Sequence, residues 1–328
     1  MNCLVTGANG FLGRYVVEQL VARGDRVRVL IRRPDEDLAA LGVKTVVSDL
    51  LEAEKIAAAC SGIDAVFHVA GKAGIGGPWH DFYVSNVVGT KNVIAACRQQ
   101  NVPRLIFTSS PSVTFDGRDQ CGIDESAPYP TRWLCYYPRT KALAEQAVLA
   151  ANNGTSLVTC ALRPHLIWGP RDRHLIPRLL ERARAGQLRR VGDGQNLIDT
   201  SYVENAAQAH LQAADALTPN SPVAGKAYFL SQGEPVNCWN WIGELMNMAG
   251  LPPLKKSISA RTAYAAGTVL EMTHRLFLRS GEPRMTRFLA AQLSTSHYFN
   301  ISSAGRDFHY EPKISTLEGM RRLAASWA

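Results

Sequence analysis

The chain has 328 residues, of which 46% are apolar and 20% are charged. This composition excludes a disordered or fibrous protein, and at this length it predicts one large α/β domain or a main domain with a smaller lobe. The 36 Lys and Arg residues exceed the 28 Asp and Glu residues and give a formal charge of +8, so we expect an anionic ligand or surface.

Cysteine and histidine spacing indicates neither metal nor disulfides. The seven cysteines form no CxxC pair and are odd in number, and no His, Cys or Asp cluster has the spacing of metal ligands. The chain starts without a secretory signal pattern. Its best apolar stretch, residues 262–272, is interrupted by Glu271 and is shorter than the ~20 residues of a membrane-spanning helix. These features predict a cytoplasmic protein.

The first 230 residues alternate short β-branched runs with longer amphipathic ones, a pattern typical of βαβ units in a parallel sheet. The predicted strands are 2–6, 26–31, 44–48, 64–69, 104–108 and 156–162, and the predicted helices between them are 12–23, 52–61, 81–100 and 137–152. Each helix is long enough to cross over the sheet. We therefore predict an α/β fold with a doubly wound parallel sheet, the Rossmann type.

After residue 162, Pro and Gly divide the chain into shorter pieces, with helices predicted at 174–185, 203–217 and 315–327. Residues 255–293 form a basic amphipathic region. We predict a dinucleotide-binding domain over 1–165, to which segments around 191–230 return, and a smaller substrate-binding lobe made mainly of 166–328. Residues 250–328 hold 11 Lys and Arg against five Asp and Glu, so most of the positive surplus lies there.

A glycine-rich turn lies directly between the first predicted strand and the first helix. Gly7, Gly10 and Gly13 have the spacing GxxGxxG, which provides a tight turn and lets the backbone approach a pyrophosphate. The helix amides that follow would face the phosphates. We therefore expect the cofactor to contact the turn, with Asn9, Phe11 and Leu12 beside the glycines.

The end of the second strand indicates which dinucleotide is bound. Ile31 stands where an acid would hold the ribose 2′-hydroxyl of NAD, and Arg32 follows. A guanidinium suits a 2′-phosphate, so we predict NADP(H), although Asp35 or Asp37 could still supply the acid. Asp49, after the third strand, could accept from the adenine amino group, and a solvated loop acid is the alternative.

Tyr137 and Lys141 are four residues apart and lie on one helix face. The neighbouring Tyr136 has Thr140 at that spacing, so the pattern selects Tyr137. We expect the ammonium, together with an oxidised nicotinamide, to lower the pKa of the phenol and to make it an acid–base catalyst. Hydroxyls in 108–112, at the carboxyl end of the fifth strand, face the expected crevice, and one of them could bind a substrate carbonyl.

With these motifs in order, the chain resembles the extended short-chain dehydrogenase/reductase superfamily. The resemblance also includes 86–90 and the stretch from Arg163-Pro164 to Gly169-Pro170. It implies that Ser110 orients the carbonyl, that Tyr137 transfers the proton, and that Lys141 holds the nicotinamide ribose and tunes Tyr137. It further implies the following contacts: Asp49 and Leu50 with the adenine, Ala70 along the dinucleotide, Asn86 bracing the central helix, and Pro164 near the carboxamide.

Within the superfamily, Leu197-Ile198 stands where nucleotide-sugar enzymes carry an arginine, so the region is more similar to the 3β-hydroxysteroid dehydrogenase branch. The stretches 70–74, 111–114, 162–170, 199–202 and 281–288 resemble the 2-alkyl-3-oxoalkanoate reductases of bacterial long-chain olefin biosynthesis, which use NADPH, whereas the loop 116–124 departs from them. The resemblance implies reduction of the 3-keto group of a long-chain 2-alkyl-3-oxo acid. A 3β-hydroxysteroid or sterol dehydrogenase, a nucleotide-sugar 4-epimerase and a non-catalytic dinucleotide-binding regulator are the alternatives.

Other conspicuous residues have simpler interpretations. We expect His68 and His165 to pack or orient rather than to catalyse, and Lys72 to be solvated rather than to bind a substrate carboxylate. The helices around 263–278 and 288–293, with Arg275, Arg279, Arg284 and Arg287, predict a basic cover over the substrate pocket. A membrane surface or a partner enzyme of the same pathway is the alternative contact for this cover. We also expect a homo-oligomer and no nucleic acid.

Overall fold

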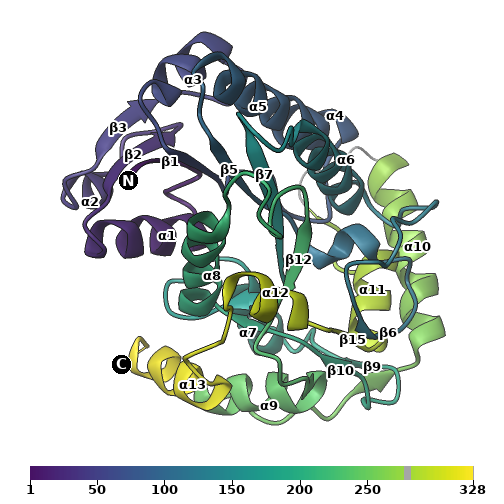
Figure 1. Cartoon of the computed structure of the whole chain (residues 1–328). Helices are drawn as coiled ribbons and strands as arrows, with labels where there is room; N and C mark the ends of the chain where they lie inside the picture. Colours follow the sequence, from purple (N-terminus) through teal and green to yellow (C-terminus); the bar gives the residue numbers. More distant parts are fainter. Residues whose placement is uncertain (277–281, 328) are drawn as a thin grey trace.

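A seven-stranded parallel sheet forms the centre of the molecule (Figure 1). The computed structural model describes residues 1–276 and 282–327. The sheet order is β12-β7-β5-β4-β1-β2-β3, and every neighbouring pair is parallel. The strands are β1 (Asn2–Thr6), β2 (Arg26–Ile31), β3 (Lys44–Val47), β4 (Ala65–His68), β5 (Arg104–Thr108), β7 (Val158–Pro164) and β12 (Ala227–Leu230). The doubly wound fold is confirmed, and the strand order reverses between β1 and β4, where ligands of such sheets bind beyond the carboxyl ends of the strands.

Helices cover both faces of this sheet, because its strands carry apolar side chains on both sides. One face packs against α1 (Phe11–Ala22), α8 (Val203–Ala216) and α12 (Ser302–Phe308), and the other against α3 (Ala53–Cys60), α5 (Gly89–Gln99) and α6 (Tyr136–Ala151). The short helix α2 (Glu36–Ala39) follows β2, and the 3-10 turn η2 (Pro111–Thr114) follows β5.

The seventh strand, β12, was not among the six that the sequence predicts. It pairs with β7 from Ala227↔Ala161 to Leu230↔Pro164. Tyr228, Phe229 and Leu230 are fully buried. A short apolar run that is buried on both faces has no alternating pattern, so periodicity alone does not separate it from a buried loop or helix. The predicted strand 156–162 is found two residues later, at Val158–Pro164.

The long helix predicted over 81–100 is three joined pieces. They are α4 (Trp79–Phe82), the π-helical turn η1 (Tyr83–Val88) and α5. Asn86 lies inside the π turn, a rare feature that is frequent at functional sites. Gly89 begins α5, and a Cβ on it would lie 2.9 Å from Leu50 Cβ, so the glycine allows the loop after β3 to pack against this helix.

Most of the second half of the chain, together with residues 120–123, builds a smaller lobe with its own apolar core. Trp168 lies at its centre, with ring centres 5.3 Å from Tyr202 and 5.9 Å from Trp241. The helices of the lobe are α7 (Leu175–Arg184), α9 (Cys238–Met248), α10 (Ala260–Leu276), α11 (Arg287–Ser294) and α13 (Thr316–Ala325). Its short strands are β6 (Gln120–Ile123), β8 (Ile167–Trp168), β9 (Arg190–Val191), β10 (Leu197–Ile198), β11 (Ser201–Tyr202), β13 (Val236–Asn237), β14 (Ser257–Ile258) and β15 (His297–Phe299).

The chain then returns from this lobe to the large sheet. Phe308 of α12 packs against Tyr228 of β12 with ring centres 5.0 Å apart, and Ala304 and Tyr310 join the core on the α1 side. Tyr310 Oη donates to the Ser231 carbonyl at 3.0 Å, just beyond the end of β12. The edge strand is therefore covered by residues that lie about 80 positions later in the sequence.

Among the described residues, no helix is both long and apolar enough to cross a membrane. The same part of the chain contains no cluster of three or more His, Cys, Asp or Glu side chains that could hold a metal ion. All seven cysteines are free thiols, and five of them are buried.

Candidate active site at the carboxyl ends of the strands

The glycine turn brings the backbone close to a neighbouring strand end. Gly7 has φ +72°, and a Cβ on it would lie 2.7 Å from the backbone of Ala70. A Cβ on Gly13 would lie 2.2 Å from the Gly7 carbonyl oxygen. Gly10 is the N-cap of α1 and provides no side-chain cap, so the beginning of this helix is open toward the crevice. Such a helix start, next to a backbone without Cβ atoms, fits a pyrophosphate.

Next to this turn, Asn9 and Gly10 are exposed, Phe11 is half-buried, and Leu12 is buried in the core. Leu12 therefore supports the turn from below, and its side chain is not available to a ligand. Ala70 donates its amide to Thr6 Oγ1 at 3.2 Å, which fixes the strand end that faces the glycines.

Two exposed arginines, and two acids that form ion pairs, follow the end of β2. Arg32 and Arg33 are exposed, and neither forms an ion pair with any described residue. Asp35 caps α2 by accepting from the Leu38 amide and pairs with Arg14 at 3.1 Å. Asp37 is paired with the same guanidinium at 3.5 Å. The free charges at this strand end are therefore positive.

Asp49 and Leu50 lie in the loop after β3. Asp49 Oδ1 accepts from the Leu51 amide at 3.0 Å, and the Asp49 amide donates to Glu52 at 2.9 Å, so the loop is held by its own polar groups. Leu50 is half-buried against Gly89, and its carbonyl accepts from Asn92 at 2.8 Å. The Asp49 Oδ2 atom accepts no hydrogen bond from the described chain.

Tyr137 and Ser110 are in hydrogen-bond contact beside the end of β5. Ser110 caps η2, and its hydroxyl lies 2.8 Å from Ser112 Oγ. Tyr137 is in the first turn of α6, where Pro138 needs no hydrogen-bond partner for its nitrogen. Burial raises the pKa of Tyr137, and its hydrogen bond with Ser110 opposes this effect. The direction is opposite to the expected lowering, because burial of the phenol is the largest effect on its pKa.

Lys141 is only 4% exposed and donates to the Thr108 carbonyl at 2.5 Å. Its Nζ also lies 4.0 Å from the centre of the Phe107 ring. Burial lowers the pKa of Lys141 to about 7, and the carboxylate of Glu145 opposes the shift. The Lys141 side chain therefore reaches from α6 to the carboxyl end of β5.

Asn86 joins the loop after β4 to the helix that carries Tyr137. It accepts from the Lys72 amide at 2.6 Å and donates to the Lys72 carbonyl at 3.0 Å and to Thr140 Oγ1 at 3.0 Å. Thr140 in turn donates to the Tyr137 carbonyl at 3.0 Å. Asn86 thus fixes the position of the first turn of α6 relative to the crevice.

The two histidines near the site are fully engaged. His68 is buried between Thr6 Oγ1 (2.8 Å) and Thr90 Oγ1 (2.9 Å), and burial lowers its pKa to about 3. His165 Nε2 lies 2.7 Å from His297 Nδ1, and burial lowers the pKa of both imidazoles. The imidazoles of His68 and His165 are therefore neutral, and they orient the residues to which they are hydrogen-bonded. Lys72 is not simply solvated, because it forms an ion pair with Asp81 at 2.8 Å.

Pro164 ends β7, beside a buried ion pair that the sequence analysis did not identify. Arg163 donates to Glu145 at 2.9 and 2.6 Å, and Tyr129 donates to the same carboxylate at 2.7 Å. One feature of the sequence does indicate this pair: Glu145 is an acid four residues after Lys141, on a mostly buried helix face. The pair joins the middle of α6 to β7, so the helix with Tyr137 is held there as well as at its first turn.

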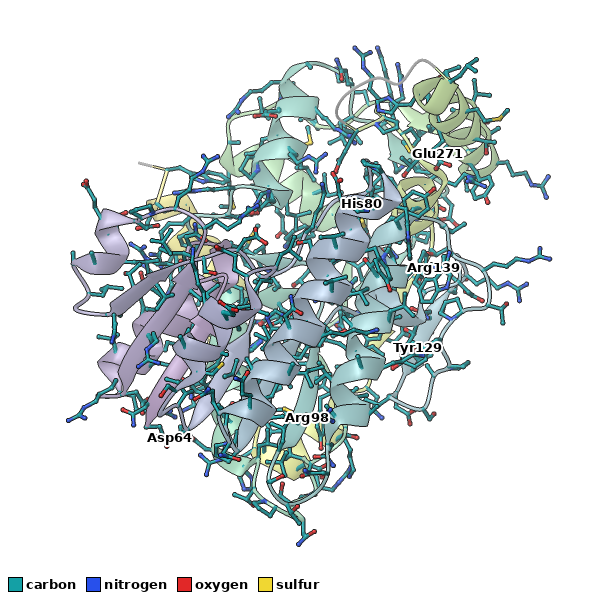
Figure 2. All side chains as sticks on the ribbon, turned by 90° about the horizontal axis from the view of Figure 1, so that it is seen from above. Asp64, His80, Arg98, Tyr129, Arg139 and Glu271 are labelled. Carbon is teal, nitrogen blue, oxygen red and sulfur yellow. The ribbon has the colours of Figure 1, made fainter. Side chains whose placement is uncertain are left out.

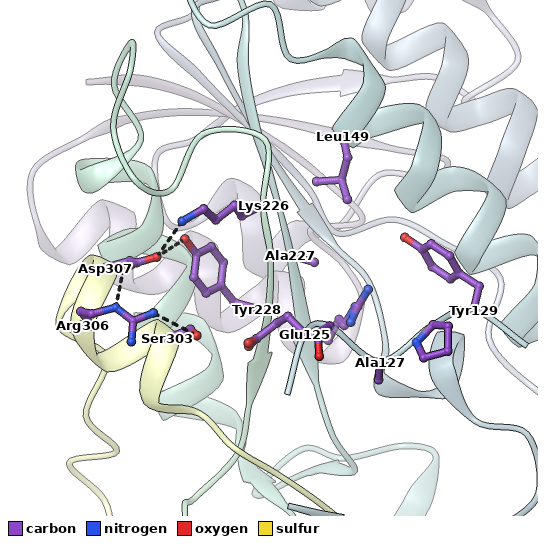
Figure 3. Close-up of a pocket in the computed structure, with 13 residues that line it drawn as sticks. Glu125, Ala127, Tyr129, Leu149, Lys226, Ala227, Tyr228, Ser303, Arg306 and Asp307 are labelled. Carbon is purple, nitrogen blue, oxygen red and sulfur yellow. Dashed lines mark hydrogen bonds and ion pairs between the residues drawn. The ribbon is translucent and has the colours of Figure 1, made fainter. Parts of the chain in front are cut away.

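A separate pocket of about 430 Å³ lies at the edge strand β12 (Figure 3). Its charged groups face one another: Asp307 pairs with Lys226 at 3.5 Å and Arg306 at 3.2 Å and accepts from Tyr228 Oη at 2.7 Å. Its lining includes Tyr129 and Arg163, which contact Glu145 of α6, but it does not include Ser110, Tyr137 or Lys141. The pocket is therefore separate from the Ser110, Tyr137 and Lys141 side chains.

The site combines a glycine turn and an open helix start with Ser110 and Tyr137 beside a buried lysine. This combination is that of a nucleotide-dependent oxidoreductase of the short-chain dehydrogenase type. The model of the 3-beta hydroxysteroid dehydrogenase/isomerase family matches residues 4–260, and the chain belongs to that family.

Known proteins of this kind are similar over nearly the whole chain. The 2-alkyl-3-oxoalkanoate reductase of Shewanella oneidensis is 48% identical over 332 residues, covering 99% of this chain and 86% of the relative. A sterol-4-alpha-carboxylate 3-dehydrogenase (decarboxylating) of Mus musculus is 34% identical, covering 99% of this chain and 90% of that protein. The solved UDP-glucose 4-epimerase of Thermus thermophilus, in complex with NAD, is 23% identical with a TM-score of 0.73, covers 100% of this chain and 99% of that one, and shows the common fold.

Proposed function

We propose that the chain is an NADPH-dependent reductase that converts the 3-keto group of a long-chain 2-alkyl-3-oxoalkanoic acid to the 3-hydroxy acid, a step of olefin biosynthesis. The observation that carries the proposal is the contact of Tyr137 with Ser110 beside the buried Lys141, at the end of β5. The substrate class is supported by the 48% identity to a 2-alkyl-3-oxoalkanoate reductase over nearly the full chain.

Ser110 and Tyr137 have distinct roles in the proposed reduction. Ser110 and Tyr137 would each donate a hydrogen bond to the substrate carbonyl oxygen, which polarises the carbonyl group. When bound, the nicotinamide supplies the hydride that the carbonyl carbon gains. Tyr137 gives its proton to the oxygen as negative charge develops there, and the product is the alcohol. Because burial raises the pKa of Tyr137, the phenol carries the proton that a reduction consumes.

The cofactor would lie along the carboxyl ends of the strands. Gly7, Gly10 and Gly13 would hold the pyrophosphate, with Asn9 and Phe11 beside it, Leu12 supporting the turn and Ala70 lining it. Asp49 and Leu50 would meet the adenine, Lys141 the nicotinamide ribose, and Pro164 the carboxamide. These contacts follow the order of the strands across the sheet.

The proposed preference for NADPH depends on the end of β2. Arg32 is exposed and has no acidic partner among the described residues, so it is available to a 2′-phosphate. Asp35 and Asp37, the acids that could instead hold a 2′-hydroxyl, are engaged by Arg14. A charge-assisted contact to phosphate is the stronger interaction of the two.

The proposal is tested by measuring NADPH oxidation by the purified protein with long-chain 2-alkyl-3-oxo acids, with 3-oxosteroids and with UDP-glucose. We expect turnover of a long-chain 2-alkyl-3-oxo acid and at least about tenfold lower kcat/KM with 3-oxosteroids, a difference of about 1.4 kcal/mol. Because 3-oxo acids lose carbon dioxide spontaneously, the stable 2-alkyl-3-hydroxy acid with NADP⁺ provides the reverse reaction.

Two outcomes would contradict this assignment. Faster turnover of a 3-oxosteroid would favour the sterol dehydrogenase that the family and the murine relative suggest. Interconversion of UDP-glucose and UDP-galactose without net NADPH consumption would favour the epimerase, although neither Leu197 nor Ile198 can pair with a diphosphate. Oligomeric state and pathway partners stay predictions.

A further inference from the structure

Helix α10 packs on the rest of the protein through one narrow face. Ala263 is fully buried, and a Cβ on Gly267 would lie 2.6 Å from the backbone of Thr286, so the helix crosses the start of α11 at very close range. Glu271, one turn farther along this face, accepts from the Arg287 amide at 2.7 Å and from its guanidinium at 2.8 Å. These contacts fix which side of α10 faces outward.

The opposite face of α10 is apolar and exposed. We call Ala265, Val269, Met272 and Leu276 the outer stripe; their spacing of three and four residues places them on one side of the helix. The exposed fraction is 59% for Val269, 66% for Met272 and 76% for Leu276. An amphipathic helix normally turns its apolar stripe to the core, so an outward stripe indicates a surface that something else covers.

The surroundings of the outer stripe are cationic. Lys255, Lys256, Arg261 and Arg284 are exposed, and none of the four forms an ion pair within residues 1–276 and 282–327. The two acids of the same region are already neutralised, since Glu271 is bound by Arg287 and Glu282 by Arg178. The side chain of Arg275, and all of Arg279, lie outside the described residues. The unpaired charge around α10 is therefore positive.

We propose that α10 is a peripheral membrane anchor, whose outer stripe enters the surface of a bilayer that contains anionic phospholipids. Exposed apolar residues with basic neighbours on one helix are the combination that binds such surfaces. A second copy of the chain fits less well, because it would bring the same unpaired cations together without acids to face them. The proposal is independent of which ketone the enzyme reduces.

The placement of α10 gives this anchor a consequence for the active site. Glu282, in the segment between α10 and α11, accepts from the Ile75 amide at 3.0 Å, so this segment contacts the loop that follows β4. In Figure 2, Glu271 is at the same end of the molecule as His80 and Arg139, which belong to the beginnings of α4 and α6. Membrane contact through α10 would hold this end of the protein at the lipid surface.

The test is flotation of the full-length protein with phosphatidylcholine vesicles, alone or with about one third phosphatidylglycerol. We expect at least about tenfold stronger binding to the anionic vesicles at low salt, weakening as ionic strength rises. The variant Val269→Ser, Met272→Ser, Leu276→Ser should lose this binding. Lys255→Gln, Lys256→Gln, Arg261→Gln should lose the preference for the anionic lipid.

A matched control separates the outer stripe from apolar exposure in general. Val47, Leu197 and Leu317 are 46%, 38% and 82% exposed on other parts of the surface, so the triple serine variant at these positions should bind vesicles like the unaltered protein. Unchanged NADPH binding shows that each variant is folded. Absence of wild-type binding, or equal loss in the control, overturns the proposal. So does a stripe variant that only converts a dimer to a monomer in sedimentation velocity without vesicles, which would identify a second copy as the occupant.

Discussion

Charged side chains are buried and paired at the sheet end with Tyr137, whereas several cations around helix α10 are exposed and, among the described residues, unpaired. Lys141, Arg163 and Glu145 are 4%, 3% and 0% exposed, and each is held by a hydrogen bond or an ion pair. Lys255 and Arg261 are exposed and unpaired within the described chain. The comparison suggests that buried, partnered groups fix the reaction, whereas loosely held groups adapt the enzyme to its surroundings. Substitutions should therefore affect chemistry in the first region and location in the second.

The largest effect is expected for Tyr137→Phe. Removing the proton donor should lower kcat by about 10³-fold, within the usual contribution of a general acid, while the NADPH Kd changes by less than about twofold. Steady-state kinetics and cofactor fluorescence titration measure the two quantities. Tyr136→Phe is the matched control and should keep nearly full activity. Turnover of Tyr137→Phe within about tenfold of the unaltered enzyme would remove the proposed mechanism.

Two glycines, one in the first turn of α1 and one in α9, should differ in how their substitution changes the free energy of unfolding. Gly13→Ala places a methyl group 2.2 Å from the Gly7 carbonyl oxygen, so we expect a loss of about 2–4 kcal/mol in the free energy of unfolding. Gly243→Ala, in α9, meets no atom within 4 Å and should instead stabilise by up to about 1 kcal/mol. Urea unfolding of both variants gives the comparison. Equal effects would show that the glycine turn is less constrained than its geometry indicates.

Arg32→Ala tests the cofactor preference. Loss of one charge-assisted contact to the 2′-phosphate should reduce the ratio of kcat/KM for NADPH to that for NADH by about 10- to 100-fold. Arg26→Ala removes an exposed arginine at the other end of β2 and should leave the ratio unchanged. If the ratio is the same in both variants, the 2′-phosphate binds elsewhere or the enzyme prefers NAD.

A pH dependence of stability is also expected, and it originates at Lys141. In the fold its pKa is about 7, below its ordinary 10.5, so between these values the unfolded chain binds a proton that the folded chain does not. Stability should therefore rise with pH over this window, by at most about 1.4 kcal/mol per pH unit. Lys141→Met should flatten the slope and lower kcat by less than Tyr137→Phe does, whereas Lys91→Met, at an exposed position, should change neither the slope nor kcat. An unchanged slope in Lys141→Met would assign the pH dependence to other groups.

Local patterns predicted most of the large sheet. The first five strands appear within two residues of their predicted ends, because each is a β-branched run between turn residues. The π turn around Asn86 was not predictable, since its residues are compatible with an ordinary helix, and the widening is accompanied by contacts to Lys72 and Thr140. Tertiary contacts, rather than propensity, explain these differences.

For the candidate site, spacing selected the residues but not their partners. The four-residue interval from Tyr137 to Lys141 identified a shared helix face, yet it could not show that the ammonium binds the Thr108 carbonyl, which lies 33 positions earlier. Likewise, the contact of His165 with His297 spans 132 positions. The assignment of the site residues themselves stays a prediction until the variants are measured.

The return of the chain from the lobe to β12 has a consequence for the order in which the protein is made. Tyr228 is synthesised about 80 residues before Phe308 and Tyr310 cover it and Ser231. On the ribosome, the edge of the nucleotide-binding sheet therefore stays open until the lobe has emerged, a period of several seconds at ordinary rates of translation. During that time an apolar edge strand is accessible to chaperones and to mispairing. Completion of the large sheet therefore depends on residues that follow most of the smaller lobe in the sequence.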